Sequence, residues 1–273
     1  MEFDKKVIVI TGGASDIGKA ISTQLINYDC TIVLLDINKD GMEAFQKEQT
    51  GKKAQIVLIH ADMTDETVVE NCFNQIVLKY GLIDYLFNIV GYGLVGEARD
   101  MTGDHWKNIV NVNFFGMLYP TLIGYKIMVK QKSGSIMNMS SIGGVVPSPF
   151  NTGYAATKAA IIGLSVSLRE EGKEFGVNVS VVCAGGINTK LWDNVRLIKI
   201  PIEGFKKLIP PSTLASPEKA AKLMIKGAVK KKRILFFPAS GKVFNFVYKF
   251  LPGVYCAGVK MSVNSLRSLR QES

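Results

Sequence analysis

The sequence has few of the residues that build metal and nucleophilic centres. It contains only two histidines, His60 and His105, which stand far apart in the chain. Its four cysteines are scattered and include no pair at the spacing of zinc ligands. We therefore expect no metal site, and we expect the cysteines to be free thiols in a reducing compartment.

Long apolar runs are also absent. No run approaches the roughly 18 residues that a membrane-spanning helix needs. The first residues carry no long apolar stretch of the signal-peptide type, and the last residues carry no lipidation, peroxisomal or retention signal. We expect a cytoplasmic protein rather than an integral membrane or secreted one.

Acidic residues are scarce in the last third of the chain. The net charge is +10, from 33 Lys and Arg against 23 Asp and Glu. Residues 1–189 hold 16 basic and 19 acidic residues, whereas residues 190–273 hold 17 basic and only 4 acidic ones. Such an excess indicates an anionic partner, either nucleic acid or an acidic membrane surface. We expect no nucleic-acid binding, because neither a groove-entering motif nor a base-stacking platform accompanies the charge.

Short Val- and Ile-rich runs alternate with longer segments of helical period, which is typical of βαβ units. The predicted strands are 7–11, 31–35, 54–60, 83–88, 134–138, 177–183 and 234–237. The predicted helices between and after them are 17–28, 39–49, 65–79, 105–113, 114–130, 153–174 and 217–229. This pattern predicts one Rossmann-type, doubly wound α/β domain, a parallel sheet of about seven strands in the order 3-2-1-4-5-6-7 with helices on both faces. We expect this domain to span residues 1–238, followed by an amphipathic extension over residues 239–273.

A glycine-rich turn follows the first predicted strand. Residues 11–18 read Thr-Gly-Gly-Ala-Ser-Asp-Ile-Gly and lead directly into a predicted helix. Glycines allow a tight turn, and the free N–H groups of a helix N-terminus bind a pyrophosphate. Asp36 ends the next strand, where its carboxylate can accept hydrogen bonds from a ribose 2′-OH and would repel a 2′-phosphate. The turn therefore predicts a dinucleotide site that favours NAD over NADP, although many such turns only join a strand to a helix.

Tyr154 and Lys158 stand four residues apart on a predicted helix, hence on one face of it. An ammonium beside a phenol stabilises the phenolate, so we expect Lys158 to lower the pKa of Tyr154. A phenol tuned in this way can exchange a proton with a substrate oxygen. Ser141 lies 13 residues earlier, just beyond a predicted strand, with Ser140 as its neighbour.

Taken in order, these residues resemble the short-chain dehydrogenase/reductase family. The family's phosphate turn has the pattern T-G-x-x-x-G-x-G; Thr11, Gly12 and Gly18 match it, but Asp16 replaces the middle glycine. We expect the Asp16 carboxylate to point to solvent or to cap the helix N-terminus. Two further segments agree in part, since 88–91 resembles N-N-A-G and 182–189 resembles V-x-P-G-x-x-x-T with Ala184 in place of proline.

The resemblance implies a complete site. The implied catalytic residues are Asn113, Ser141, Tyr154 and Lys158. The implied cofactor-binding residues are Thr11, Gly12, Ser15, Asp16, Ile17, Gly18, Asp36, Asp62, Met63, Asn88, Gly91, Tyr154, Lys158, Gly185, Ile187 and Thr189. In the implied mechanism Tyr154 exchanges the proton, Ser141 orients the substrate oxygen, Lys158 binds the nicotinamide ribose and Asn113 supports a proton-relay water. The resemblance also implies a homodimer or homotetramer.

Residues 190–215 are expected to form an apolar substrate lid, broken by Pro201, Pro210 and Pro211. Residues 242–255 form an aromatic, amphipathic stretch that Pro252-Gly253 should interrupt. This stretch either packs on the protein's own substrate pocket or a subunit interface, or lies in an anionic membrane surface.

The sequence thus predicts an NAD-dependent oxidoreductase that interconverts a secondary alcohol and a ketone on an apolar substrate, such as a steroid, a lipid-derived molecule or a small aliphatic one. The alternative is a non-catalytic NAD-binding or membrane-peripheral scaffold on the same fold.

Overall fold

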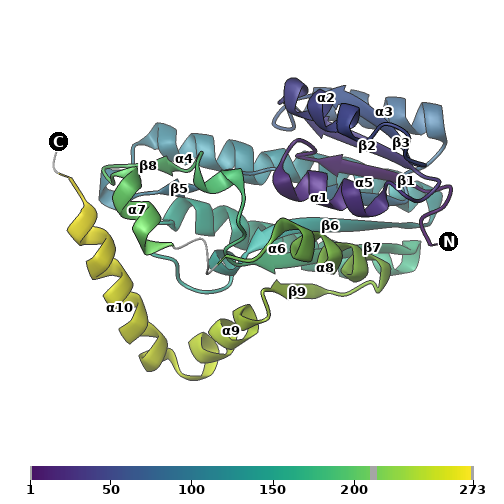
Figure 1. Cartoon of the computed structure of the whole chain (residues 1–273). Coiled ribbons are helices and arrows are strands. Elements are labelled where there is room, and N and C mark those ends of the chain that lie inside the picture. The colour runs from purple at the N-terminus through teal and green to yellow at the C-terminus, as the bar shows by residue number, and fades with distance from the viewer. Residues whose placement is uncertain (1, 210–213, 272–273) are drawn as a thin grey trace.

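The computed structural model describes residues 2–209 and 214–271, and its centre is a seven-stranded parallel sheet (Figure 1). The strands are β1 (Val7–Thr11), β2 (Thr31–Asp36), β3 (Gln55–His60), β4 (Tyr85–Asn88), β6 (Gly134–Ser141), β7 (Val177–Ala184) and β9 (Ile234–Phe237). Their order, β3-β2-β1-β4-β6-β7-β9, is 3-2-1-4-5-6-7 when the seven are numbered along the chain, so the predicted topology is confirmed. A separate pair, β5 (Leu94–Val95) and β8 (Arg196–Leu197), was not predicted.

Helices cover both faces of the sheet, as expected (Figure 1). One face packs against α1 (Asp16–Leu25), α2 (Lys39–Glu48) and α8 (Pro217–Val229). The other packs against α3 (Glu66–Tyr80), α5 (Gly116–Gln131) and α6 (Thr152–Gly172). All residues of β1 and β7 are buried, which explains why β1 is apolar up to Thr11, and the polar Asn178 and Ser180 of β7 are satisfied by a hydrogen bond to each other at 3.0 Å.

The helix α4 (Gly103–Val110) runs into α5 through a π-helical turn, η2 (Asn111–Phe115). Such turns are often found at functional sites. Here the turn contains Asn113, for which the sequence predicted a functional role. Short 3-10 turns complete the body of the protein: η1 (Ala98–Asp100), η3 (Ile142–Gly144), η4 (Lys173–Phe175) and η5 (Lys190–Trp192).

The expected lid contains η5, β8 and α7 (Ile202–Leu208), while Pro210 and Pro211 lie outside the described residues. The chain ends in two helices, α9 (Ser240–Phe250) and α10 (Pro252–Leu269), which meet at Leu251 in a V (Figure 1). The interruption predicted at Pro252 is confirmed. Within the described residues, no helix has the length and hydropathy required to cross a bilayer.

Candidate active site

The carboxyl ends of β1, β4, β6 and β7 lie at one edge of the sheet because these strands are parallel neighbours. The segments that follow them contain the glycine-rich turn, Gly91, Ser141 and Gly185. This edge is where open α/β sheets bind their ligands. The topology therefore brings together residues that are up to about 170 positions apart in the sequence.

The glycine-rich turn is a cradle that side chains would fill. Gly12 has φ +70°, and a Cβ built on it would lie 3.2 Å from the Ile89 carbonyl carbon. A Cβ on Gly18 would lie 2.5 Å from the Gly12 oxygen, and one on Gly13 would lie 2.8 Å from Leu34 Cβ. Neighbouring backbone and side chains can approach the turn this closely only because all three positions are glycine. Gly13 was not among the predicted cofactor-binding residues. In the sequence, the doubled glycine at positions 12 and 13 was the signal that could have identified Gly13.

Ser15, not Asp16, caps helix α1. The Ser15 hydroxyl accepts a hydrogen bond from Gly18 N at 3.1 Å and donates one to the Gly12 oxygen at 2.6 Å. The expectation that Asp16 caps this helix is wrong. The carboxylate of Asp16 instead accepts a hydrogen bond from Lys190 N at 2.6 Å, which ties α1 to the start of the lid. Ile17, next in the helix, is buried in the core.

Asp36 is held at the turn by two backbone hydrogen bonds. One of its carboxylate oxygens accepts from Ala14 N at 3.0 Å and the other accepts from Asn38 N at 2.8 Å. The carboxylate therefore lies against the glycine-rich turn, as a ribose-binding acid must. Beyond β3, Asp62 accepts hydrogen bonds from the backbone N and the hydroxyl of Thr64, both at 2.8 Å, and Met63 is buried.

Thr11 and Asn88 belong to a fully buried polar network beneath the turn. The Thr11 hydroxyl donates to Asn88 Oδ1 at 3.1 Å, and Asn88 Nδ2 donates to Thr121 and to Asn138, each at 2.9 Å. The two side chains therefore fix the ends of β1 and β4, and they support the turn from below.

Tyr154 and Lys158 lie on α6, at the same edge of the sheet. The Lys158 ammonium donates to the Met139 oxygen at 3.1 Å and lies 5.6 Å from the centre of the Tyr154 ring. A Cβ built on Gly91 would lie 3.2 Å from Lys158 Nζ and 3.3 Å from Asn113 Oδ1, so both polar atoms converge on that glycine. Asn113 pairs with the Tyr92 backbone, accepting from its N–H and donating to its carbonyl oxygen, both at 2.9 Å.

Burial dominates the ionisation of this pair. It lowers the pKa of Lys158 to about 8. It also raises the pKa of the Tyr154 phenol above its usual range, an effect that the hydrogen bond with Ser141 partly offsets. The expected net lowering of the Tyr154 pKa beside Lys158 is wrong, because the desolvation of the phenol outweighs the hydrogen bond with Ser141.

Ser141, rather than its neighbour Ser140, faces the tyrosine. The Ser140 hydroxyl is buried and donates to the Lys158 backbone oxygen at 2.7 Å. The Ser141 hydroxyl accepts from Gly143 N at 3.1 Å. A Cβ on Gly143 would lie 3.6 Å from Ser141 Oγ and 3.4 Å from Ser148 Oγ. Ser148 therefore connects the Ser141 side of the site to the cavity described below.

The segment after β7 closes the site on its other side. Gly185 N donates to the Phe237 oxygen at 2.6 Å, and the Trp192 indole donates to the oxygen of the buried Ile187 at 2.6 Å. Thr189 precedes the turn η5. These bonds hold the segment between the sheet edge and the lid.

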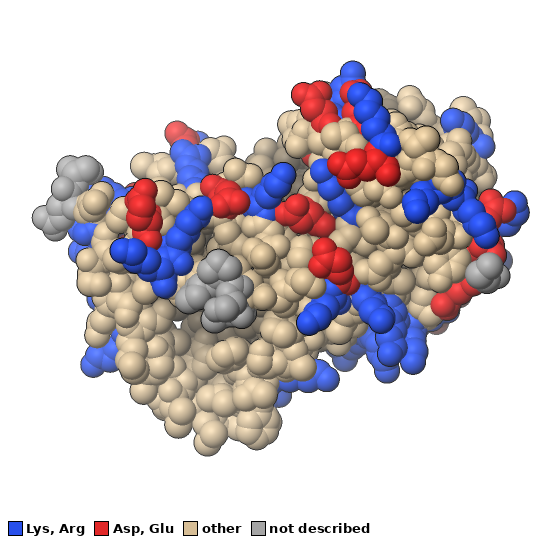
Figure 2. All heavy atoms as spheres, viewed as in Figure 1, with Lys and Arg blue, Asp and Glu red and all other residues tan. Residues whose placement is uncertain are grey.

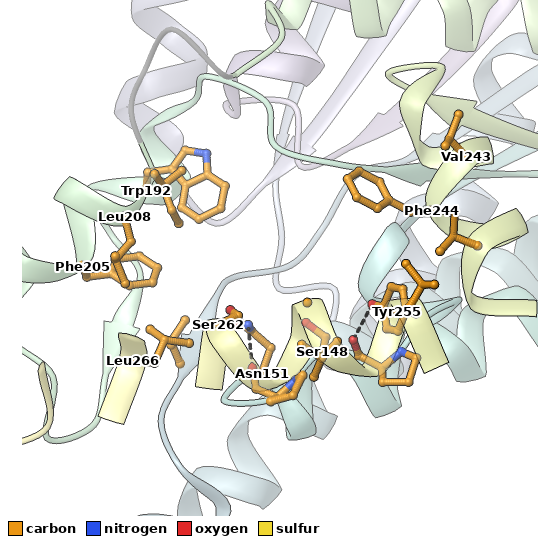
Figure 3. Close-up of a pocket in the computed structure, with 18 residues that line it drawn as sticks. Ser148, Asn151, Trp192, Phe205, Leu208, Val243, Phe244, Tyr255, Ser262 and Leu266 are labelled. Carbon is orange, nitrogen blue, oxygen red and sulfur yellow. Dashed lines mark hydrogen bonds between the residues drawn. The ribbon is translucent and has the colours of Figure 1, made fainter. Parts of the chain in front are cut away.

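An apolar cavity of about 630 Å³ lies beyond Ser148 (Figure 3). Its walls come from five regions: β5, the loop before α6, the lid, α9 and α10. The lining includes Ser148, Asn151, Trp192, Phe205, Phe244 and Leu266. Ser141, Tyr154 and Lys158 are not part of its wall; Ser148 is the lining residue that lies near Ser141. The sequence predicted an apolar lid and left open whether residues 242–255 pack on the substrate pocket. In the structure this stretch lines the cavity together with the lid, and the Tyr255 hydroxyl donates to the Pro147 oxygen at 2.9 Å.

Comparisons with known proteins agree with this geometry. The short chain dehydrogenase family model matches residues 6–198. The chain is 31% identical to the 3-oxoacyl-acyl-carrier-protein reductase FabG of Thermotoga maritima over 225 residues, which cover 82% of this chain and 91% of that protein. It is 30% identical to the 3-dehydrosphinganine reductase of Danio rerio over 227 residues, which cover 81% of this chain and 68% of that protein.

Solved structures share the fold. A levodione reductase superimposes with a TM-score of 0.76 at 23% identity, covering 87% of this chain and 98% of that one. The structure of ElxO with NADP bound superimposes with a TM-score of 0.77 at 24% identity, covering 87% of this chain and 99% of that one. An NAD⁺-bound xylitol dehydrogenase superimposes with a TM-score of 0.74 at 21% identity, covering 87% of this chain and 99% of that one. The matched family model and the relatives above 30% identity establish that the chain belongs to the short-chain dehydrogenase family of oxidoreductases, which bind a nicotinamide cofactor.

Proposed function

We propose that this oxidoreductase uses NAD(H) to interconvert a secondary alcohol and a ketone on an apolar substrate. The observation that carries the proposal is the convergence of Tyr154, Lys158 and Ser141 at the carboxyl edge of the sheet, beside an apolar cavity. A lipid-derived chain or a steroid fits a cavity of about 630 Å³ better than a small aliphatic molecule does.

The residues of the glycine-rich turn fit a dinucleotide. Gly12, Gly13 and Gly18 leave room for close approach, and the first turn of α1 offers N–H groups to a pyrophosphate. Asp36 is the residue that favours NAD, because its carboxylate, fixed by Ala14 N and Asn38 N, would repel a 2′-phosphate. Structures of this fold hold either cofactor, so the preference rests on Asp36.

The bound nicotinamide supplies or accepts the hydride, and the protein's residues manage the proton. In reduction, Ser141 Oγ donates a hydrogen bond that orients the substrate carbonyl, and the Tyr154 phenol donates its proton to the carbonyl oxygen. The raised pKa of Tyr154 keeps the phenol protonated at neutral pH, as a general acid must be. Lys158, held by the Met139 oxygen, stabilises the phenolate that remains, and Asn113 positions the loop at Tyr92.

The test is turnover of a panel of steroid, long-chain and short aliphatic ketones with NADH, and with NADPH alongside. We expect NADH to be preferred, and we expect Asp36→Ala to narrow that preference by improving use of NADPH. Preference of the native protein for NADPH would overturn the role of Asp36. Tight NADH binding with no turnover of any ketone or alcohol would instead support a non-catalytic scaffold.

We further propose that the protein is a cytoplasmic homodimer or homotetramer. The proposal rests on the habit of the family, and light scattering of the purified protein tests the oligomeric state. A monomer at micromolar concentration would contradict it.

A further inference from the structure

The two C-terminal helices expose an unusual number of large apolar side chains. On α9 the phenyl rings of Phe246 and Phe250 are 55% and 60% exposed and lie against each other with their centres 4.8 Å apart. On α10, Met261 is 72% exposed. The further exposed apolar residues of the two helices and their junction are Val243, Phe244, Tyr248, Leu251 and Val254. We call the whole set the tail patch. A contiguous apolar surface of this kind marks a site of interaction.

The tail patch is continuous with the cavity. Val243, Phe244 and Val254 are more than half exposed, yet they also line the cavity wall (Figure 3). Figure 3 shows Val243 and Phe244 across the cavity from Trp192 and Phe205. These three residues therefore both face outward at the V of α9 and α10 and border the cavity, whereas the other residues of the tail patch do not line it.

The charged side chains of α9 and α10 themselves are all basic, and at the end of the tail Arg267 and Arg270 pair with Glu97 and Asp100. From residue 219 to residue 271 the sequence has 12 Lys and Arg and no Asp or Glu. Lys242, Lys249 and Lys260 are exposed on the two helices themselves. In Figure 2 the lower end of the molecule is uncharged, with basic side chains on either side of it, and the acidic side chains visible in this view lie further up.

We propose that the tail patch docks on an anionic lipid bilayer, and that an apolar substrate enters the cavity from that bilayer. Aromatic side chains with flanking lysines suit the boundary between headgroups and acyl chains, where the apolar face is buried and the ammonium groups meet anionic lipid. The entry route rests on the proposed function, whereas docking itself does not.

A second copy of this chain is the less suitable occupant. Apposed copies of the tail patch would bring their lysines together, which costs free energy, and lysine is depleted from protein interfaces. A bilayer with anionic lipid instead attracts the same lysines.

The first experiment measures co-sedimentation of the full chain with phosphatidylcholine vesicles, with and without phosphatidylserine. We expect binding that phosphatidylserine strengthens and that high salt weakens. The double variant Phe246→Ser/Phe250→Ser changes tail-patch residues that do not line the cavity, and it should weaken vesicle binding about tenfold or more. Leu78→Ser on α3, where the side chain is 89% exposed on another part of the molecule, is the matched control and should bind like the native chain.

Cys256 offers a second readout, because it is exposed on α10 while the other three cysteines are buried. An environment-sensitive dye on this thiol should shift to shorter wavelength when phosphatidylserine vesicles are added. No vesicle binding by the native chain, or equal binding by the double variant, would overturn docking. A change in oligomeric state of the double variant without any vesicle binding would assign the surface to a second copy instead.

The second experiment tests the entry route. A long-chain methyl ketone dissolved in the vesicles should be reduced more slowly by Phe246→Ser/Phe250→Ser, whereas a short, water-soluble ketone should be reduced at the native rate. Equal rates on the vesicle-bound ketone would overturn the route while leaving the reaction intact. Absence of turnover on both ketones by the native chain would count against the proposed function and leave the vesicle-binding result standing.

Discussion

The body of the molecule, residues 2–189, and its tail, helices α9 and α10, are held in place by different forces. In the body, buried strands and a buried polar network fix each site residue; Asn88, Asn113 and Lys158 are all buried and hydrogen-bonded. In the tail, only Gly241 and Leu266 are buried, and surface ion pairs anchor its end. The proposed chemistry therefore depends on single atoms in the body, whereas the proposed bilayer docking depends on the combined apolar surface and charge of the tail.

The largest expected effect compares the same substitution in the two regions. Tyr154→Phe removes the hydroxyl that exchanges the proton and should lower ketone reduction about 10³-fold while NADH still binds. Tyr255→Phe removes only the hydrogen bond to the Pro147 oxygen and should change the rate less than about tenfold. For both variants, steady-state NADH oxidation measures the rate of ketone reduction, and fluorescence titration measures NADH binding. Full activity of Tyr154→Phe would exclude the proposed chemistry.

The pH dependence of stability should report the buried lysine of the body. Lys158 has a pKa of about 8 in the folded protein against 10.5 for an unperturbed lysine, so the unfolded chain binds more protons between these values. The free energy of unfolding should therefore gain about 2 kcal/mol from Lys158 as the pH rises from about 7 to 10. Urea unfolding at both pH values measures it. Lys158→Met should lack this gain. If the free energy of unfolding of that variant rises with pH as much as that of the native protein, Lys158 is not the cause of the rise.

Two matched glycine substitutions, one in the body and one in the tail, should differ in their effect on the free energy of unfolding. In Gly91→Ala the new Cβ would crowd Lys158 Nζ and Asn113 Oδ1 at a φ of +150°, so we expect a loss of about 1–2 kcal/mol and a slower reaction. Gly253→Ala in α10 meets no atom within 4 Å and should be neutral or slightly stabilising. Thermal unfolding distinguishes the two. Equal melting temperatures would mean that the site around Gly91 can relax.

The smallest effect concerns acid release of the tail. Arg270 makes two hydrogen bonds to the Asp100 carboxylate, at 2.7 and 2.9 Å, and Arg267 pairs with Glu97. These arginines hold the pKa of both carboxyl groups below their usual range. The stability that these pairs contribute is therefore fully present above about pH 4.5, the ordinary pKa of a glutamate, and it is lost as the pH falls through the lowered pKa values. Trypsin cleaves tail lysines only at higher pH, so an acid-active protease such as pepsin measures this release, with cleavage of α10 expected before cleavage of the body.

Arg270→Ala should reproduce the loosened tail at neutral pH, while Lys107→Ala, which removes an exposed pair with Asp104, should not. Equal protection of α10 in Arg270→Ala would show that apolar packing around Leu266 alone anchors the helix.

The strands, and the placement of most candidate site residues at the carboxyl edge of the sheet, could be predicted from the sequence because they follow from local signals. Continuously apolar runs mark strands buried on both faces, and Gly12, Gly18 and Asp36 stand at fixed distances from the first two strands. The pair of β5 and β8 escaped prediction because two-residue strands carry no periodic signal. The bond from Lys190 N to Asp16 joins residues 174 positions apart, so no local pattern could show it, whereas the Ser15 cap follows the ordinary N-cap preference of serine.

By itself, the sequence determined the family, the parallel sheet and the identity of the residues at its carboxyl edge, because hydrophobic period and motif spacing are local properties of the chain. Only the tertiary structure decided the ionisation of Tyr154 and Lys158 and the walls of the cavity. The physical reason is that desolvation and cavity shape depend on everything packed around a group. Here that includes the loop before α6, the lid and two helices from the far end of the chain, which no spacing along the sequence brings together.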